Sequence, residues 1–231
     1  DQKLMIILLV KNNNELESEK LGAKFFGFVK SNEVYDIFIQ GPNFFQSKKY
    51  NINLNSFVHG AELKSYEFNL YKTKKKNKII NFNIHKLDIF KKKQKLDPIL
   101  SGVNFTRDLV SEPGNILHPD EYARRLLPLK KLGIKVTVYD KKKLKKLGCN
   151  ALLGVGQGSV RGSYLVTMEW NGTKSKSKPL AFVGKGVCFD TGGYSLKPAR
   201  FMEDMTYDMA GSATVVGLMK NLAIRKAKIN A

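Results

Sequence analysis

The chain has 231 residues, of which 42% are hydrophobic, and its formal net charge at pH 7 is +20. This length and apolar content are enough to bury the core of one large domain or of two smaller ones. No run approaches the roughly 18–20 consecutive apolar residues of a membrane-spanning helix, so we expect no membrane partner.

The positive charge comes almost entirely from lysine, which is spread along the chain together with abundant asparagine and isoleucine. Basic surfaces neutralise phosphates, so a non-catalytic, nucleic-acid-binding module is one alternative. This composition is, however, typical of a biased proteome that places lysine at neutral surface positions. The densest clusters, residues 72–78 and 91–95, are typical of solvated loops or linkers. Nucleic acid is therefore not the expected main partner.

Residues 1–95 predict a small N-terminal α/β domain. Short apolar runs separated by turn signals predict strands, and residues 60–71 carry apolar side chains at helical spacing. The expected strands are residues 4–10, 25–29, 34–39 and 79–84, with a turn at residues 30–33. No group of catalytic residues stands out in this part of the chain.

Residues 96–118 predict a linker helix followed by a loop. Ile99, Val103 and Leu109 have the spacing of one helix face, and the sequence SEPGN at residues 111–115 ends that helix. The charged stretch before the helix places the domain boundary near residue 95.

Residues 119–231 predict a β/α alternation, which is typical of an α/β domain with a central sheet. Pro119 opens a helix that Pro128 is expected to kink, and Asp140 caps a lysine-rich helix that Gly148 ends. The expected strands are residues 134–139, 151–155, 164–170 and 180–183, with a turn at 171–172 and a last helix over 211–227.

The cysteines and histidines do not form a recognisable site. Cys149 and Cys188 make no disulfide framework and no Cys-x-x-Cys motif, so we expect a reduced, cytoplasmic compartment. The three histidines lack the spacing of zinc ligands. A metal site in this chain would need carboxylates and another type of ligand.

Two glycine-rich stretches match phosphate-binding loops only in part. The sequence GKG at residues 184–186 has no Ser or Thr after its lysine, and Pro179 stands where a P-loop has its first glycine. The sequence GVGQGS at residues 154–159 has Ser in place of the third glycine of a dinucleotide fingerprint. A tight turn between strands is the better interpretation of the second stretch.

The segment from Lys185 to Asp208 places two lysines and two aspartates in an apolar, glycine-rich sequence. Such groups are costly to bury unless they are paired or bound. Two carboxylates with a neutral amine suit a divalent cation of the zinc or manganese type. The alternative is two ordinary salt bridges, which would join Lys185 to Asp190 and Lys197 to Asp208. The spacing leaves both interpretations open.

The same segment resembles the signature of the leucine aminopeptidase (cytosol aminopeptidase) family. The resemblance is carried by VGKGVCFDTGGYSLK at residues 183–197 and MEDMTYDMAGSA at residues 202–213. Further support comes from GAELKSYEFNLYKTK at 60–74, RDLVSEPGN at 107–115, LLGVGQGSVR at 152–161 and EWNG at 169–172. The resemblance implies a macro-like N-terminal domain over residues 1–95, the linker helix and loop of residues 96–118, and the first part of a metallopeptidase catalytic domain over 119–231.

The resemblance also implies a role for each charged residue of the segment. Lys185 and Asp208 would bind one of two divalent cations, manganese or zinc, and Asp190 would bridge both. Lys197 would be the catalytic lysine that stabilises the oxyanion, and Met205 would line the pocket for the first side chain of the substrate. The expected activity is release of single N-terminal amino acids from peptides, with a metal-bridging water as the nucleophile.

The chain departs from the family pattern in one respect. The remaining ligands of the family lie in an Asn-Thr-Asp-Ala-Glu-Gly-Arg motif, which does not occur in these 231 residues. We therefore expect a fragment that is inactive by itself, taken from a parent peptidase that continues beyond it. The resemblance further implies a homo-oligomer, a hexamer in this family, in the cytoplasm. A non-catalytic scaffold role through such oligomer contacts is a further alternative.

Overall fold

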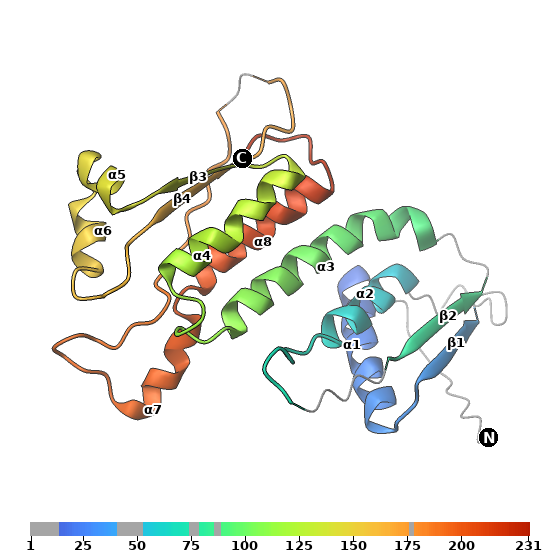
Figure 1. Ribbon diagram of the computed structural model, residues 1–231. Helices are drawn as coiled ribbons and strands as arrows, with labels where there is room; N and C mark the ends of the chain where they lie inside the picture. The colour runs from blue at the N-terminus through green and yellow to red at the C-terminus, as the bar shows by residue number, and fades with distance from the viewer. Residues whose placement is uncertain (1–13, 41–52, 74–78, 86–88, 176–177) are drawn as a thin grey trace. The chain divides into compact units, whose positions relative to one another are not determined.

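The computed structural model describes residues 14–40, 53–73, 79–85, 89–175 and 178–231 (Figure 1). The chain divides into two compact units, Asp1–Leu100 and Ser101–Ala231. Helix α3 (Ile89–Ser111) belongs to both, so the boundary expected near residue 95 falls within this helix. Among the described residues, every helix is too short or too polar to span a bilayer.

The first unit combines two helices with a pair of parallel strands. Its elements are α1 (Glu15–Ser31), β1 (Asp36–Gln40), α2 (Leu54–Lys64) and β2 (Asn81–His85). Both helices begin at an asparagine, since the Asn14 side chain accepts a hydrogen bond from the backbone N–H of Glu17, and Asn53 accepts one from Ser56. Strands β1 and β2 pair in parallel from Asp36 opposite Asn81 onward.

Helices α1 and α2 pack closely because each presents a glycine to the other. Gly22 of α1 lies against the backbone of Phe57, and Gly60 of α2 lies against the backbone of Glu19. A side chain at either glycine would overlap the backbone of the facing helix. The core formed beneath this contact consists of Phe25, Val29, Ile37, Phe57 and Val58.

The expected strand at residues 25–29 is wrong, because these residues form part of α1. Its buried positions are Ser18, Gly22, Phe25, Phe26 and Val29. Each of these positions lies three or four residues from another of the set, so the apolar run is one face of an amphipathic helix. The strands expected at residues 34–39 and 79–84 are confirmed as β1 and β2.

Two further expectations for the first unit have different outcomes. The helix expected over residues 60–71 is confirmed only in its first part, because α2 ends at Lys64. The strand expected at residues 4–10 lies outside the described residues.

The second unit surrounds one helix near the end of the chain. Its elements after α3 are α4 (Pro119–Leu126), η2 (Leu127–Leu132), β3 (Lys135–Tyr139), α5 (Lys141–Lys146), α6 (Asn150–Val155), β4 (Leu165–Glu169), α7 (Ala199–Met202), η3 (Glu203–Tyr207) and α8 (Ala210–Ile224). Strands β3 and β4 pair in the antiparallel sense, with Lys135 opposite Glu169. Figure 1 shows α8 running beside α4.

The core of the second unit gathers around α8. The buried face of this helix contains Ala213, Val216, Met219, Leu222 and Ala223, which confirms the last helix expected from the sequence. Next to Ala213 on α8, Gly217 meets Gly102 of α3 at backbone distance, and Thr106 donates from Oγ1 to the carbonyl of Ala213 over 3.0 Å. The part of α3 after residue 100 is thereby fixed against α8.

Several local predictions for the second unit are confirmed. Helix α3 ends at Ser111, and α4 gives way at Leu127 to the 3-10 helix that contains Pro128. Asp140 caps α5 by accepting from the backbone N–H of Lys143 at 2.9 Å, and Gly148 after α5 has a φ of 71°.

Two strands expected in the second unit are wrong. Residues 151–155 belong to helix α6, none of whose side chains is buried, so no sheet face holds them extended. Residues 180–183 have no regular secondary structure, although the N–H of Leu180 donates to the carbonyl of Asn230 at 2.9 Å. The final residues instead lie along residues 170–172, where Trp170 and Ala231 exchange two backbone hydrogen bonds.

Candidate active site

The candidate site is built from the loop of residues 183–197 and the chain that leads into α8. Gly184 comes so close to the start of α8 that an added Cβ would lie 2.5 Å from the Cα of Ser212. Gly192 and Gly193 have φ values of 89° and 69°, a left-handed conformation that turns the loop sharply. These glycines let the chain pass the helix terminus and then fold back on itself.

All four charged residues singled out in the sequence come together in two ion pairs. Lys185 Nζ lies 2.5 Å from Asp208 Oδ1, and Lys197 Nζ lies 2.9 Å from Asp190 Oδ2. The expected alternative of two ordinary salt bridges joined these residues the other way round, and that pairing is wrong. The loop path set by the glycines brings Lys185 to Asp208, just ahead of α8, so that Asp190 pairs with Lys197.

Asp208 is the most enclosed of these charged side chains, with 16% of its side chain exposed. Its Oδ1 atom accepts from Lys185, whereas its Oδ2 atom is buried and has no hydrogen-bond partner among the described residues. A buried carboxylate oxygen without a partner costs free energy. This oxygen therefore has the properties of a ligand whose cation would complete its coordination.

Asp190 pairs with Lys197 and also feels the charge of Lys185. The hydrogen bond from Lys197 is the main reason that the pKa of this carboxyl is lowered, and the backbone N–H of Gly192 adds to it at 2.8 Å. The charges of Lys197 and Lys185 lower the pKa further. Asp190 is thus held as a carboxylate, the form that binds cations.

Lys197 also contacts Met205, the methionine for which the family resemblance implies substrate binding. Its Nζ atom lies 3.0 Å from the Sδ atom of Met205, which belongs to η3. The backbone N–H of Lys197 donates to the carbonyl of Thr191 at 2.9 Å, and this bond closes the loop between Thr191 and Lys197. The ammonium group is therefore flanked by a carboxylate and a thioether.

The donors present have the chemistry of part of a metal site. No group of three or more His, Cys, Asp and Glu side chains that could hold a metal occurs in the described part of the chain. Asp190, Asp208 and the amine of Lys185 instead supply two carboxylates and one nitrogen. Such a mixed oxygen and nitrogen set suits manganese or zinc, and the unpartnered oxygen of Asp208 fits this assignment.

Two residues that hold the loop in place, Tyr122 and Ser212, were not expected from the sequence. The Tyr122 hydroxyl lies 3.0 Å from Ser212 Oγ, and the Ser212 N–H donates to the carbonyl of Lys185 at 2.9 Å. The two residues lie 90 positions apart, so no local pattern joins them. The only signal was the placement of a serine at the start of a helix.

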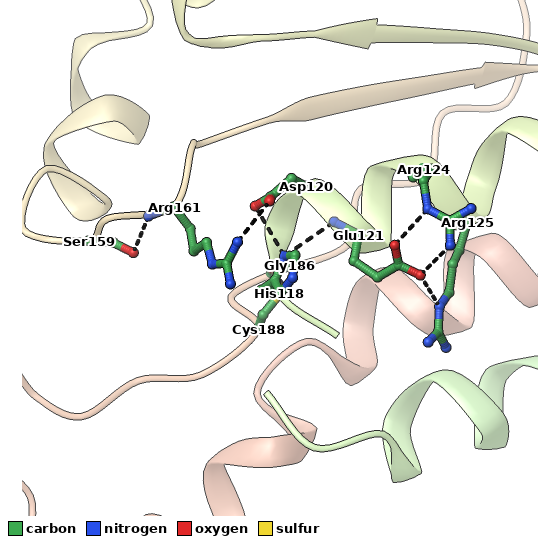
Figure 2. A network of polar contacts seen from close by, with 9 residues as sticks. All are labelled: His118, Asp120, Glu121, Arg124, Arg125, Ser159, Arg161, Gly186 and Cys188. Carbon is green, nitrogen blue, oxygen red and sulfur yellow. Dashed lines mark hydrogen bonds and ion pairs between the residues drawn. The ribbon is translucent and has the colours of Figure 1, made fainter. Parts of the chain in front are cut away.

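A second polar network surrounds the start of α4 and was also missed (Figure 2). Arg125 bonds Glu112 at 2.6 Å, and the Glu112 side chain is 2% exposed. Hydrogen bonds from Arg124 and then Arg125 lower the pKa of Glu121 to about 2. These contacts tie α4 to the loop that follows α3.

At the other end of this network, Asp120 faces the candidate loop. Its Oδ2 atom accepts from Arg161 at 3.4 Å (Figure 2). Burial, followed by the charge of Asp120, raises the pKa of the Cys188 thiol to about 12. Cys188 is thus a buried, neutral thiol that packs in the core of the second unit.

Comparisons with known proteins agree on one family. A model described as the cytosol aminopeptidase family, catalytic domain, matches residues 104–231. A probable cytosol aminopeptidase of Phytoplasma mali is 54% identical over 185 residues, which cover 76% of this chain and 37% of that protein. The chain thus spans little more than a third of this curated relative.

Two solved structures share the fold. The cytosol aminopeptidase of Coxiella burnetii has a TM-score of 0.76 at 23% identity, and the match covers 92% of this chain and 44% of that one. The bottromycin maturation enzyme BotP, solved in complex with Mn, has a TM-score of 0.74 at 22% identity. That match covers 93% of this chain and 45% of the BotP chain.

Proposed function

The chain belongs to the cytosol aminopeptidase family, and from that premise we propose that the whole protein is a metal-dependent aminopeptidase. It would release single N-terminal amino acids from peptides. The observation that carries the proposal is the meeting of Lys185, Asp190, Lys197 and Asp208 at the start of α8, with one oxygen of Asp208 buried and unpartnered.

In this proposal, Lys185 and Asp208 hold one divalent cation, and Asp190 is shared between two. Bound cations would supply Lewis-acid activation of water and of the peptide carbonyl. An amine acts as a metal ligand only when it is neutral, so a cation bound here would displace the proton that Lys185 donates to Asp208. Manganese and zinc both suit this donor set, and the Mn complex of BotP supports manganese.

Lys197 is the residue that we propose acts on the substrate directly. Its ammonium group would stabilise the negative charge that develops on the carbonyl oxygen of the scissile bond. Asp190 orients this ammonium, and Met205 lies beside it. Met205 would then contact the side chain of the N-terminal residue, which must lie next to the bond that is cleaved.

The rest of the proposal concerns the whole protein. The matched relative is longer than this chain, and we propose that the missing ligands lie in the remainder, so that these 231 residues alone are inactive. We also propose a cytoplasmic homo-oligomer, a hexamer, with peptides as substrates and no membrane partner. The names of the matched cytosol aminopeptidases support the location.

The test compares peptides with free and acetylated N-termini, using the full-length protein. The expected result is release of the first residue from the free peptide only, with activity lost on treatment with a chelator and restored by Mn²⁺. The 231-residue chain, assayed in parallel, should be inactive. Cleavage of the acetylated peptide, or full activity after chelation and dialysis, would contradict the proposal.

A basic nucleic-acid-binding module is the second candidate function. The observation that favours it is the net charge of +20. Its test compares DNA binding by two variants of the chain, in each of which a different cluster of lysines is replaced.

A further inference from the structure

Helix α8 begins without a side-chain cap of its own. Its N-cap residue is Met209, which makes no side-chain cap hydrogen bond. The first backbone N–H groups of any helix lack partners within the helix, and they are usually satisfied by a capping side chain. Here the N–H of Ser212 donates to the carbonyl of Lys185 at 2.9 Å. The backbone of a proposed metal ligand thus takes over part of the capping of α8.

The hydroxyl of Ser212 joins this cap to α4. Ser212 Oγ donates to the carbonyl of Met209 at 2.8 Å. A hydroxyl has a single hydrogen, so at the second contact, 3.0 Å from the Tyr122 hydroxyl, Ser212 Oγ must accept. The phenol of Tyr122 is therefore the donor. Burial raises its pKa to about 12, so its hydrogen is present throughout the neutral range.

The packing leaves Lys185 little room to move away from this arrangement. An added Cβ at Gly186 would lie 3.3 Å from Ser212 Oγ, and one at Gly211 would lie 3.2 Å from the backbone nitrogen of Lys185. Tyr122 itself is 6% exposed and belongs to the core of the second unit. The hydroxyl pair therefore ties Ser212 to the buried core, and the backbone N–H of Ser212 in turn holds the carbonyl of Lys185.

We propose that Tyr122 and Ser212 are positioning residues, which fix the backbone of Lys185 so that its amine meets Asp208 and the cation that both would hold. The inference rests on the proposed function. Outer contacts that orient metal ligands typically change metal affinity or activity by about 10- to 100-fold. Neither hydroxyl touches the substrate in this scheme, so their loss acts on metal affinity first.

The test uses Tyr122→Phe, Ser212→Ala and the double variant in the full-length protein. Thr214→Ala is the matched control, because Thr214 lies on the same helix and its hydroxyl donates only locally, to the carbonyl of Ala210 at 2.9 Å. Mn²⁺ affinity is measured by competition with a fluorescent chelating indicator, and kcat and KM are measured at saturating Mn²⁺. Thermal unfolding is followed for every variant.

Each single variant should bind Mn²⁺ about tenfold more weakly than the wild type. The double variant should be no weaker than either, because the two hydroxyls act as a unit. At saturating Mn²⁺ the kcat should return to near the wild-type value, and Thr214→Ala should behave as wild type throughout.

Unchanged Mn²⁺ affinity in both single variants would overturn the inference, even if their thermal stability fell. The same holds if Thr214→Ala weakens binding equally. A wild-type protein that binds no Mn²⁺ would overturn the proposed function and this inference with it. If the wild type binds Mn²⁺ and the variants bind it with the same affinity, the inference is overturned and the proposed function is not.

Discussion

Lys185 and Lys197 carry the same charge and lie in the same loop, yet they face different carboxylates. Lys185 meets Asp208, whose second oxygen is buried and unpartnered, whereas Lys197 meets Asp190 and the sulfur of Met205. The family resemblance implies metal binding for the first lysine and contact with the substrate for the second, and this difference in surroundings agrees with the proposal. The assignment predicts that the two lysines can be separated by mutation.

Replacing Lys197 by alanine in the full-length protein should lower kcat while leaving the metal content near normal. The side chain would stabilise charge only as the reaction proceeds, and loss of one such donor costs about 10²–10³-fold in kcat. Steady-state kinetics and elemental analysis of the same preparation make the measurement. Lys178→Ala, an exposed lysine before the loop, is the control. Loss of both metals in Lys197→Ala would refute its assigned role.

Replacing Asp190 by alanine should remove metal occupancy and activity together, because a bridging carboxylate serves both cations. The same change also frees Lys197 and the backbone N–H of Gly192. Elemental analysis of the purified full-length protein gives the stoichiometry. Asp204→Ala, an exposed aspartate on η3, should keep both metals. A full complement of metal in Asp190→Ala rules out the bridging role.

The two cysteines should differ in reactivity toward iodoacetamide. The Cys188 thiol is 6% exposed, and burial raises its pKa to about 12, so at pH 8 it remains the unreactive neutral form. Cys149 is more exposed and should be labelled first. Peptide mapping by mass spectrometry, with and without urea, measures both sites. Rapid labelling of Cys188 in the folded protein would show that the loop above it opens.

The sequence was sufficient to find the charged residues of the site, but not to find what holds them. Lys185, Asp190 and Asp208 stand out because charged groups are unusual in an apolar, glycine-rich segment. Their pairing could not be predicted, since it depends on how Gly192 and Gly193 turn the chain. The bond between Tyr122 and Ser212 joins ordinary residue types far apart in sequence, and only the fold brings them together.

At the scale of elements, the close contact of α1 and α2 depends on glycine at specific positions. Gly22→Ala should lower the free energy of unfolding by about 1–3 kcal/mol, because the added methyl group overlaps the backbone of Phe57. Gly27→Ala lies on the same helix with nothing within 4 Å of the added Cβ, and it should stabilise by about 0.4–1 kcal/mol. Urea titration followed by circular dichroism measures both. Equal effects of the two substitutions would contradict the proposed packing.

Elements with a local chemical signal were predicted well, and short apolar runs were not. The cap at Asp140, the glycine at 148 and the break after Ser111 each act within a few residues, and all three are confirmed. Residues 25–29 and 151–155 are apolar runs of five residues, which suit a strand or one face of a helix equally. Tertiary packing decides between them: the first run is buried against α2, and the second contributes no buried side chain.

At the scale of the whole molecule, the alternation of elements predicted an α/β chain, but not which strands pair. The parallel pair β1 and β2 joins residues 45 positions apart, Asp36 and Asn81. The antiparallel pair β3 and β4 joins Lys135 to Glu169 across α5 and α6. Such pairings depend on the arrangement of the intervening helices, which no short window of sequence contains. The net charge, by contrast, follows from the composition of the whole chain and can be calculated without knowing the fold.

The net charge of +20 should give weak, sequence-independent binding to DNA. Dispersed lysines neutralise phosphates without reading bases, so affinity should fall steeply between about 50 and 200 mM salt. Two clusters of equal charge test whether any lysines form a dedicated site: Lys72, Lys74, Lys75, Lys76 and Lys78, and the five lysines of residues 141–146. Replacing either set by glutamine should weaken binding to a similar extent, because only the number of charges matters.

Fluorescence anisotropy with a labelled duplex, measured over a salt series on the 231-residue chain and both variants, makes this comparison. Similar reductions in the salt slope for the two variants would agree with a solvated basic surface and leave the proposed peptidase function unchallenged. If replacing one cluster abolishes saturable DNA binding and replacing the other leaves it intact, the first cluster instead forms a nucleic-acid site. Dispersed charge cannot produce that asymmetry, because each lysine that contacts a phosphate releases about one counterion wherever it lies, so each replacement lowers the salt slope by a similar amount.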